Sequence, residues 1–296
     1  MKRRPFDKFN SLLTHGAMAV AVSALVMMTL LYVPANVSAE QVTGWADPTL
    51  LSEASDSALG IIHPQVAMND KGDAIAIWTQ QDGSSQYNLH ARMFSDGSWG
   101  RPVFLENSTG NVYNPRIAMN EKGDAVAVWR QSDGAFNSVY ANEFVHGSWG
   151  TATLLEGRDG NAYYPQIAVD GEGNAIAVWH QSEGTYNNIY ANRYSNRVWG
   201  EAMLLESNDS MASDPQIAMD DDGDAIVVWR DLWNGTLNDI HAISWNEGTW
   251  GDRVRISEPS NSATNPQIAT DGHGTMVAVW YQVFKGTYRI FATINS

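Results

Sequence analysis

The hydrophobic and polar positions of this chain alternate with a period of two over short segments. In residues 175–181, Ala, Ala, Trp and Gln occupy one side, and Ile, Val and His occupy the other. Such alternation indicates pleated strands, whose successive side chains point to opposite faces. We predict four strands here, at residues 165–169, 174–181, 188–194 and 199–205. The turn between the first two, Asp170–Asn174, has the Asp and Gly residues of a tight hairpin connection.

The same pattern recurs five times. Each copy opens with Pro, then Gln or Arg, then Val or Ile, then Ala, and a Trp follows 14 residues after the Pro. The copies begin at residues 64, 115, 165, 215 and 266. Repeats of about 50 residues with four short antiparallel strands are typical of propeller blades. We therefore predict an all-β, five-bladed β-propeller, with an open β-solenoid as the alternative.

The two ends of the repeat region predict how the ring closes. The fifth copy ends after its third strand, whereas Trp45–Leu51 precedes the first copy and matches the fourth strand at Trp149–Leu155. We predict that an N-terminal closing strand, residues 42–53, completes the last blade. The propeller domain then spans residues 40–296 and leaves no exposed sheet edge.

Residues 1–39 have the features of a signal peptide. Four basic residues precede an apolar run from Ala17 to Val33, and small residues follow at Val37–Ala39. We predict cleavage after Ala39 and a mature protein that is periplasmic or secreted, with no further membrane span. An uncleaved membrane anchor is the alternative, because the apolar run reaches the lower length limit for crossing a bilayer.

Charge and composition exclude several classes of function. The chain has 18 basic and 33 acidic residues, a net charge of −15, and no cysteine. Cleavage after Ala39 would remove four basic residues and one acidic residue, which gives 14 − 32 = −18. Disulfides, Cys-ligated metals and thiol catalysis are excluded, and nucleic acid is not an expected partner because its binding needs clustered basic residues. We expect a neutral or cationic partner, and no cofactor or metal site.

The lengths of the connections indicate which face carries a ligand site. Length differences between copies fall before the repeat prolines and between the second and third strands, which lie on the same face of a propeller. Loops that vary on one face of a repeat array commonly form its binding surface. Residues there with aromatic, amide, basic or acidic side chains suit sugar rings and their hydroxyls. The candidate ligand-binding residues are Tyr113, Arg130, Tyr163, Tyr164, His180, Tyr186, Asp214, Arg230, Trp233 and Tyr281.

The sequence offers no catalytic pair. Glycosidases use two carboxylates at one site, yet the positions before the repeat prolines hold only Asp214, and the ends of the second strands add only Asp231. Glu106, Glu156 and Glu206 recur from copy to copy and are poor candidates for one unique catalytic role. The acidic stretch Asp220–Asp224 lacks the spacing of a calcium loop and predicts a hairpin turn. We therefore predict no catalytic residue.

The repeat from Pro165 to Trp179 resembles the repeats of exported bacterial propeller proteins that are grouped with sialidase-like chains. In its period, Trp-Gly pairs and blade number it is also similar to tachylectin-like five-bladed lectins. The resemblance covers residues 42–296 and implies a binding propeller. We predict a non-enzymatic, lectin-like protein that recognises a glycan or a cell-surface ligand. The alternatives are a sialidase-like or other glycoside hydrolase that uses Asp214 or Asp231, and a scaffold that binds another envelope protein.

Overall fold

The computed structural model describes residues 44, 46–52, 60–81, 86–107, 109–157, 159–206, 211–233, 236–259 and 261–295, without the side chains of Glu183 and Trp233. The predicted signal peptide, residues 1–39, lies outside this part of the chain, as do residues 42, 43, 45 and 53 of the predicted closing strand. Every regular element in the described part is a β-strand. No helix long and apolar enough to cross a membrane occurs among these residues.

Each repeat forms three long strands, which pair in antiparallel order. The first strands are β1 (Ile61–Met68), β6 (Val112–Met119), β11 (Ala162–Val169), β16 (Met211–Met219) and β21 (Ala263–Thr270). The second strands are β2 (Ala74–Gln81), β7 (Ala125–Ser132), β12 (Ala175–Glu183), β17 (Ala225–Trp233) and β22 (Met276–Phe284). The third strands are β3 (Tyr87–Ser95), β8 (Asn137–Val145), β13 (Tyr186–Ser195), β18 (Leu237–Asn246) and β23 (Thr287–Asn295).

The fourth strand is split into two short pieces that both pair with the third strand. These pieces are β4 (Ser98–Trp99) and β5 (Val103–Phe104), β9 (Ser148–Trp149) and β10 (Thr153–Leu154), β14 (Val198–Trp199) and β15 (Met203–Leu204), and β19 (Thr249–Trp250) and β20 (Val254–Arg255). We number the resulting sheets 1 (β1–β5), 2 (β6–β10), 3 (β11–β15), 4 (β16–β20) and 5 (β21–β23). The prediction of one continuous fourth strand is wrong. The strand is interrupted at its centre, where a glycine follows the Trp of each first piece. A short, interrupted outer strand also limits edge-to-edge pairing between molecules.

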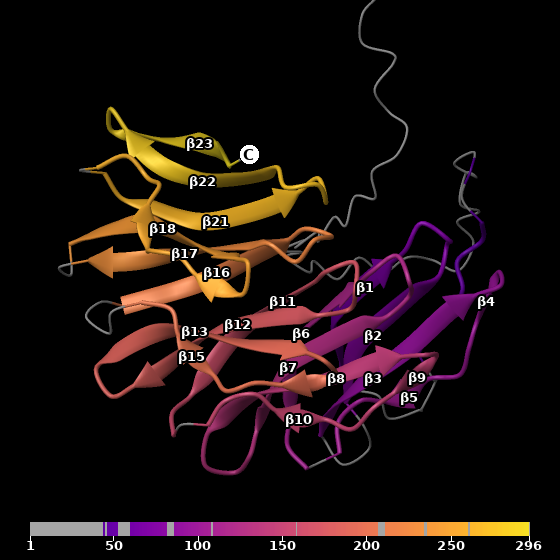
Figure 1. Ribbon diagram of the computed structural model, residues 1–296. Helices are drawn as coiled ribbons and strands as arrows, with labels where there is room; N and C mark the ends of the chain where they lie inside the picture. Colours follow the sequence, from indigo (N-terminus) through magenta and orange to yellow (C-terminus); the bar gives the residue numbers. More distant parts are fainter. Residues whose placement is uncertain are drawn as a thin grey trace, which may run out of the picture.

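The five sheets follow one another in sequence order, as the blades of a propeller do, and their first strands contact each other on the inside (Figure 1). The core lies between neighbouring sheets. Between sheets 1 and 2, for example, Ile75, Ile77 and Leu89 pack against Ala127 and Trp129. Trp129, Trp179, Trp229 and Trp280 each lie in such a cluster with residues of the preceding sheet, so the repeated Trp packs neighbouring sheets together. In four of the five sheets its indole Nε1 donates to a Gln two residues later, at 3.0–3.2 Å.

The turns between first and second strands are closed by a single side chain. In sheet 4, Asp220 Oδ1 accepts the backbone N–H groups of Asp222 and Asp224, at 3.1 and 2.9 Å. Asn69, Asn120, Asp170 and Asp271 make the same pair of bonds in the other sheets. The acidic stretch is therefore the hairpin turn that the sequence predicts.

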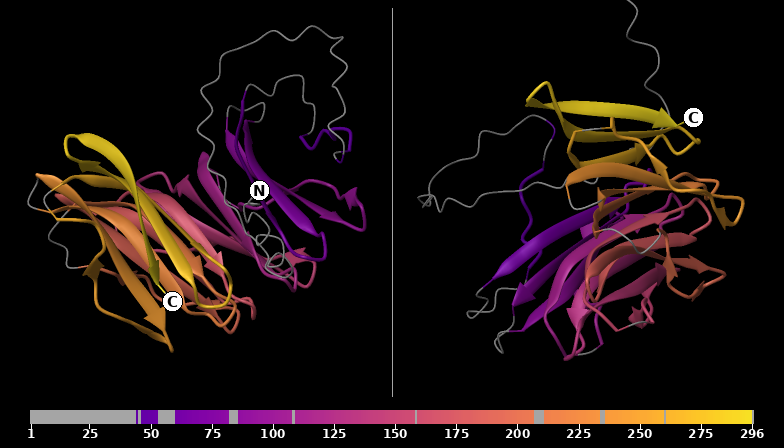
Figure 2. Two further views of the ribbon diagram at one scale, coloured as in Figure 1. Left: turned by 90° about the horizontal axis from the view of Figure 1, so that it is seen from above. Right: turned by 90° about the vertical axis from the view of Figure 1, so that its left-hand side faces the viewer.

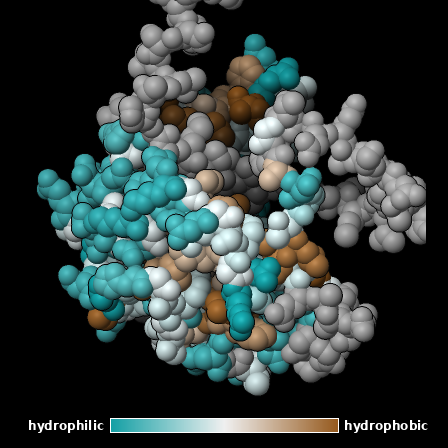
Figure 3. Space-filling view, turned by 90° about the vertical axis from the view of Figure 1, so that its right-hand side faces the viewer, coloured by the Kyte–Doolittle hydropathy of each residue, from teal (hydrophilic) through white to brown (hydrophobic). Residues whose placement is uncertain are grey.

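Sheets 1 and 5 are the two ends of the series (Figure 2), and sheet 5 has an exposed face. Within the described residues, sheet 5 has three strands, and residues 46–52 form no strand. The carbonyl of Leu50 instead accepts a hydrogen bond from Arg92 Nη1 of β3, at 3.2 Å. Ile290 of β23 is 76% exposed, whereas its counterparts Leu89, Val139, Ile189 and Ile240 are fully buried. Figure 3 shows hydrophobic residues gathered in more than one place on one side of the molecule.

Candidate functional site

A β-bulge at the same place in all five first strands shapes the candidate site. The residue before each repeat proline adopts a left-handed backbone, with φ between 51° and 56°, and the strand register shifts there. These residues are His63, Asn114, Tyr164, Asp214 and Asn265. Non-glycine residues rarely take this conformation, and bulges re-aim side chains next to functional sites. The sequence predicts a strand that starts at the proline, but the strand starts three or four residues earlier and is interrupted by the bulge.

The bulges of β11 and β16 border a cavity of about 300 Å³ between sheets 3 and 4. Its lining includes four predicted ligand residues, two that precede a proline, Tyr164 and Asp214, and two near the ends of second strands, His180 and Arg230. The remaining lining residues were not predicted as ligand residues; they are Asn187, Met211, Ser213 and Leu232. A bulge at Asp214 would have indicated Ser213 as well, because Ser213 directly precedes Asp214 and pairs with Arg230 across β16 and β17.

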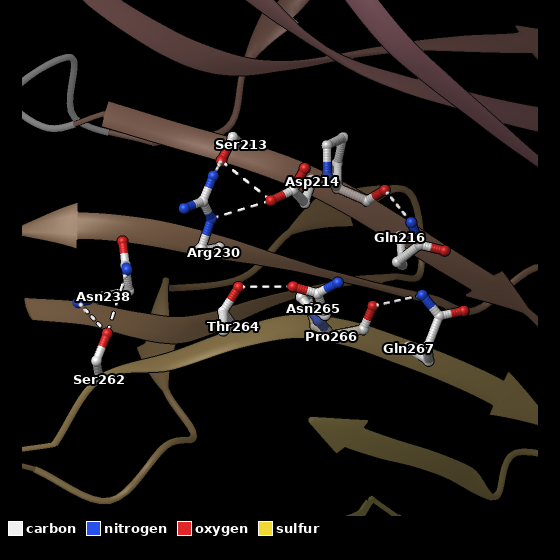
Figure 4. A network of polar contacts seen from close by, with 11 residues as sticks. Ser213, Asp214, Gln216, Arg230, Asn238, Ser262, Thr264, Asn265, Pro266 and Gln267 are labelled. Carbon is white, nitrogen blue, oxygen red and sulfur yellow. Dashed lines mark hydrogen bonds and ion pairs between the residues drawn. The ribbon is translucent and has the colours of Figure 1, made fainter. Parts of the chain in front are cut away.

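An ion pair stands at the sheet 4 side of this pocket (Figure 4). Arg230 Nε donates to Asp214 Oδ2 at 2.9 Å, and its Nη2 donates to the Ser213 hydroxyl at 2.6 Å. Both ionic side chains are partly exposed, at 33% for Arg230 and 39% for Asp214. A guanidinium has five N–H donors, so the group is held in place and keeps further N–H groups that can donate to a ligand.

A buried histidine stands at the sheet 3 side. The His180 ring lies 5.5 Å from the ring centroids of both Tyr163 and Tyr164. Burial lowers the pKa of His180 to about 4; the Asp214 carboxylate opposes this shift and the Arg230 cation adds to it. Its Nδ1 atom is buried and has no hydrogen-bond partner among the described residues. The pocket therefore holds a neutral imidazole at neutral pH, and its Nδ1 is enclosed by the protein.

A cationic and aromatic seam continues from the pocket over sheets 2 and 1. The Arg130 guanidinium lies over the rings of Tyr113 and Tyr163, 4.7 and 5.2 Å from their centroids. Arg116 directly follows the repeat proline of β6. Its Nε donates to the side chain of Gln166, the equivalent residue of β11, at 3.2 Å. Burial lowers the pKa of His63, and the Arg116 and Arg130 cations lower it further. The positive charges of Arg116 and Arg130 thus lie close together in a chain whose net charge is −15.

The remaining predicted ligand residues are not among those that line the pocket in the described part of the chain. Tyr281 contacts Tyr288 edge to face at 5.5 Å and lines a separate hollow on sheet 5. Tyr186 is exposed at the start of β13, next to the lining residue Asn187. Trp233 ends β17, but its side chain lies outside the described part. The structure thus brings together Tyr113, Arg130, Tyr163, Tyr164, His180, Asp214 and Arg230, and places Tyr281 elsewhere.

Two sets of carboxylates that were weighed from the sequence as catalytic groups have structural roles. Asp231, an alternative catalytic group, is fully buried, faces sheet 3 and contacts Arg253 Nη1 at 3.3 Å, so it cannot touch a substrate in the pocket. Glu156 accepts the backbone N–H of Val139 at 2.8 and 3.0 Å, and burial raises its pKa to about 7. Glu106 binds Leu89 in the same way. In the described part of the chain, no group of His, Asp and Glu residues could hold a metal ion.

Comparison with known proteins finds a likeness at the level of the fold. At the level of sequence, no protein-family model and no curated protein matches this chain. An α-L-arabinanase of Penicillium chrysogenum, complexed with arabinobiose, has a TM-score of 0.51 at 11% identity, over 75% of this chain and 77% of the enzyme. A PL25 ulvan lyase has a TM-score of 0.49 at 11% identity, over 77% and 68% of the two chains. The Hadza microbial sialidase Hz136 has a TM-score of 0.35 at 11% identity, over 76% and 64%.

The arabinanase corrects one prediction. It is a glycoside hydrolase, which contradicts the prediction of a non-enzymatic, lectin-like propeller. The alternative, a glycan-cleaving enzyme, fits this neighbour better. At 11% identity, the likeness concerns the fold alone.

Proposed function

We propose that this protein is an enzyme that cleaves glycosidic bonds in a glycan, with its active site in the pocket between sheets 3 and 4. The observation that carries this proposal is the neutral, buried imidazole of His180 beside the Arg230–Asp214 ion pair in one cavity. A positioned group that exchanges protons and a fixed cation supply the two effects on which glycosidic cleavage depends, proton transfer and charge stabilisation. The arabinanase fold neighbour was solved with a carbohydrate, which agrees with a glycan ligand.

The aromatic walls of the pocket suit a sugar. Tyr164 is half exposed beside His180, so its ring presents an apolar face and a hydroxyl to the cavity. Sugar rings offer C–H faces that pack on aromatic rings and hydroxyls that pair with amides and hydroxyls. Asn187 and Ser213 supply such polar partners in the same lining.

A polysaccharide screen tests this proposal. Purified residues 40–296 would be incubated with arabinan, xylan, polygalacturonate, alginate and hyaluronan, and new reducing ends would be measured. We expect new reducing ends from at least one polymer, and a loss of about 10²–10⁴-fold in rate for His180→Asn. His241→Asn is the matched control, because His241 is similarly buried but does not line the pocket. Failure to cleave every polymer, or equal activity of His180→Asn, would refute the proposed function.

We further infer that the sheets close into a five-bladed ring with residues 42–53 as the missing outer strand of sheet 5. The support is the match between Trp45–Leu51 and Trp149–Leu155, together with the exposed Ile290 face at a position that is buried in the other sheets. Closure would cover this face with sheet 1.

We also propose that the protein is exported, periplasmic or secreted, after cleavage of residues 1–39. The charged start and apolar run support export, and polysaccharide outside the cytoplasm would then be the accessible substrate. Mass spectrometry of the protein from the periplasm or medium tests this. A mature N-terminus at Glu40 is expected, and an intact N-terminus in the membrane fraction would favour the anchor instead.

A further inference from the structure

We propose that the pocket cleaves uronate-containing polysaccharides by β-elimination; this inference rests on the proposed function and names its substrate class and reaction. The number of carboxylates in the pocket distinguishes elimination from hydrolysis. Hydrolysis at a glycosidic bond uses two carboxyl groups on opposite sides of the bond. Among the described residues that line the pocket, Asp214 is the one carboxylate, and it is already paired with Arg230.

The charges around the pocket favour an acidic sugar. The Arg230–Asp214 pair is neutral as a unit, and Arg116 and Arg130 add positive charge along the adjoining seam. Positive charge beside a binding site attracts ligands of the opposite sign even when the net charge of the protein is unfavourable. This reverses the expectation of a neutral or cationic partner, which was based on net charge alone.

The arginine suits the carboxylate of a uronate. Arg230 is fixed by Asp214 and Ser213 through Nε and Nη2, which leaves Nη1 to donate to a ligand. Guanidinium binds carboxylate in a planar, paired geometry. Partial neutralisation of the uronate carboxylate acidifies the adjacent C5–H bond, because negative charge develops on the carboxylate as the proton leaves.

Two neighbouring groups can move the protons. The neutral imidazole of His180 takes the C5 proton, and the phenol of Tyr164, whose ring centroid lies 5.5 Å away, donates a proton to the leaving oxygen. The C5–H electron pair becomes the C4=C5 double bond, and the electrons of the C4–O4 bond pass to O4, which is protonated. One bond to hydrogen and one to oxygen break, one double bond forms, and no water or other reactant is consumed. Return of the proton from His180 to Tyr164 resets the site.

The surroundings of His180 set its protonation. Asp214 of β16 and Arg230 of β17 face it, and Tyr163 and Tyr164 of β11 flank its ring. Burial keeps the pKa of His180 low in the free protein, so the imidazole is unprotonated there but is a weak base. A bound uronate carboxylate would raise this pKa and strengthen the base when the substrate is present.

The closing experiment separates elimination from hydrolysis. Residues 40–296 would be incubated with polygalacturonate, alginate and hyaluronan, and with neutral arabinan and xylan. Two signals would be followed, namely new reducing ends and the ultraviolet absorbance of the conjugated C4=C5 double bond. We expect both signals to rise together with at least one uronate polymer, and no incorporation of ¹⁸O from labelled water into the products of bond cleavage.

Variants assign the roles. His180→Asn and Tyr164→Phe should each lower kcat by about 10²-fold or more, while His241→Asn should match the parent protein. Asp214 is a positioning residue here, so Asp214→Asn should raise KM about tenfold and change kcat little. If Asp214 were a catalytic carboxylate, that variant would instead lose kcat by orders of magnitude.

Each outcome decides between the two proposals. Reducing ends from a uronate polymer without the double-bond absorbance, or a collapse of kcat in Asp214→Asn, would overturn elimination and leave a glycosidase. Cleavage of arabinan or xylan alone would overturn the uronate assignment while the proposed function stands. No reducing ends from any of the five polymers would overturn the proposed function itself.

Discussion

The residues at the end of the second strand differ from sheet to sheet, whereas the residues of the core repeat. The equivalent positions hold Thr79, Arg130, His180, Arg230 and Tyr281, although the Trp directly before each of them is constant. A group that must act once in a molecule has to occupy one repeat only. The pocket is formed where two of these unlike residues, His180 and Arg230, meet across neighbouring sheets.

His180 should make the stability of the protein depend on pH. Its pKa is about 4 in the folded protein and 6.5 ordinarily, so between these values the unfolded chain binds a proton that the folded protein lacks. The free energy of unfolding is then unaffected by His180 above pH 6.5 and falls as the pH drops towards 4, by on the order of 3 kcal/mol in full. Urea unfolding at pH 4.5 and 7 measures this, and His180→Asn should reduce the difference. An unchanged difference would contradict the burial of a neutral imidazole.

Glu156 should have the opposite effect. Burial raises its pKa from 4.5 to about 7, so between these values the folded protein holds a proton that the unfolded chain has lost. Its contribution to stability is full below pH 4.5 and is lost as the pH rises to 7. Glu156→Gln should therefore gain stability relative to the parent at pH 8 compared with pH 5, by on the order of 1–3 kcal/mol. Glu172→Gln, at an exposed turn, is the control and should show no such trend.

At the scale of the strand, the bulge is the feature that the sequence reveals least. A residue before proline favours extended backbone, so the sequence predicts no left-handed residue at Tyr164 or Asp214. The structure holds both there because the strand pairs on either side of the bulge fix the backbone. The alternation that identifies β12 correctly gives the faces of Trp179 and His180. It cannot give the angle at which Asp214 meets Arg230, since that angle depends on the bulge.

Sheet 4 breaks the hydrogen bond that the other sheets share, and repairing it should stabilise the protein. Asp231 stands where the other sheets have Gln, and its Oδ1 and the Nε1 of Trp229 are buried with no hydrogen-bond partner among the described residues. Asp231→Gln combined with Arg253→Ala recreates the arrangement of sheets 2 and 3. We expect a gain of about 1–2 kcal/mol and a melting temperature that is a few degrees higher.

The reverse exchange is the matched control for this repair. Gln181→Asp removes the acceptor from Trp179 and should lower the melting temperature. A double variant at Asp231 and Arg253 that melts below the parent would mean that the buried ion pair stabilises sheet 4 more than the lost indole bond costs.

At the scale of the molecule, repetition makes the architecture predictable and local asymmetry does not. The spacing from Pro165 to Trp179 recurs in every sheet, so the strands and the packing of Trp on the next sheet follow from the sequence. The ligand face was inferred from loop lengths, and four pocket residues were among its candidates. The sequence does not show how Asp214, Arg230 and His180 lie in space, or that Arg116 and Arg130 lie on the neighbouring sheet, and the proposed function rests on both.

Closure of the ring can be tested by a cross-link, since the chain has no cysteine of its own. In sheet 2, Thr153 pairs with Ala141; the matching positions at the ends of the chain are Thr49 and Ala292. If residues 42–53 complete sheet 5, Thr49→Cys with Ala292→Cys should form a disulfide on oxidation. The pair Thr153→Cys with Ala141→Cys is the positive control, because those strands are paired in the structure.

Removal of the closing strand gives the energetic counterpart. Deletion of Gln41–Ser52 from the mature chain should lower the melting temperature by many degrees, because it strips a strand from sheet 5 and leaves Ile290 and its face exposed. The loss should amount to several kcal/mol, out of a total of about 5–15 kcal/mol for a folded domain. If these residues only rest against Arg92, as Leu50 does, the deletion should cost little. A truncated protein that melts within a few degrees of the mature form, and a Thr49–Ala292 pair that stays reduced, would together show that the sheets form an open arc.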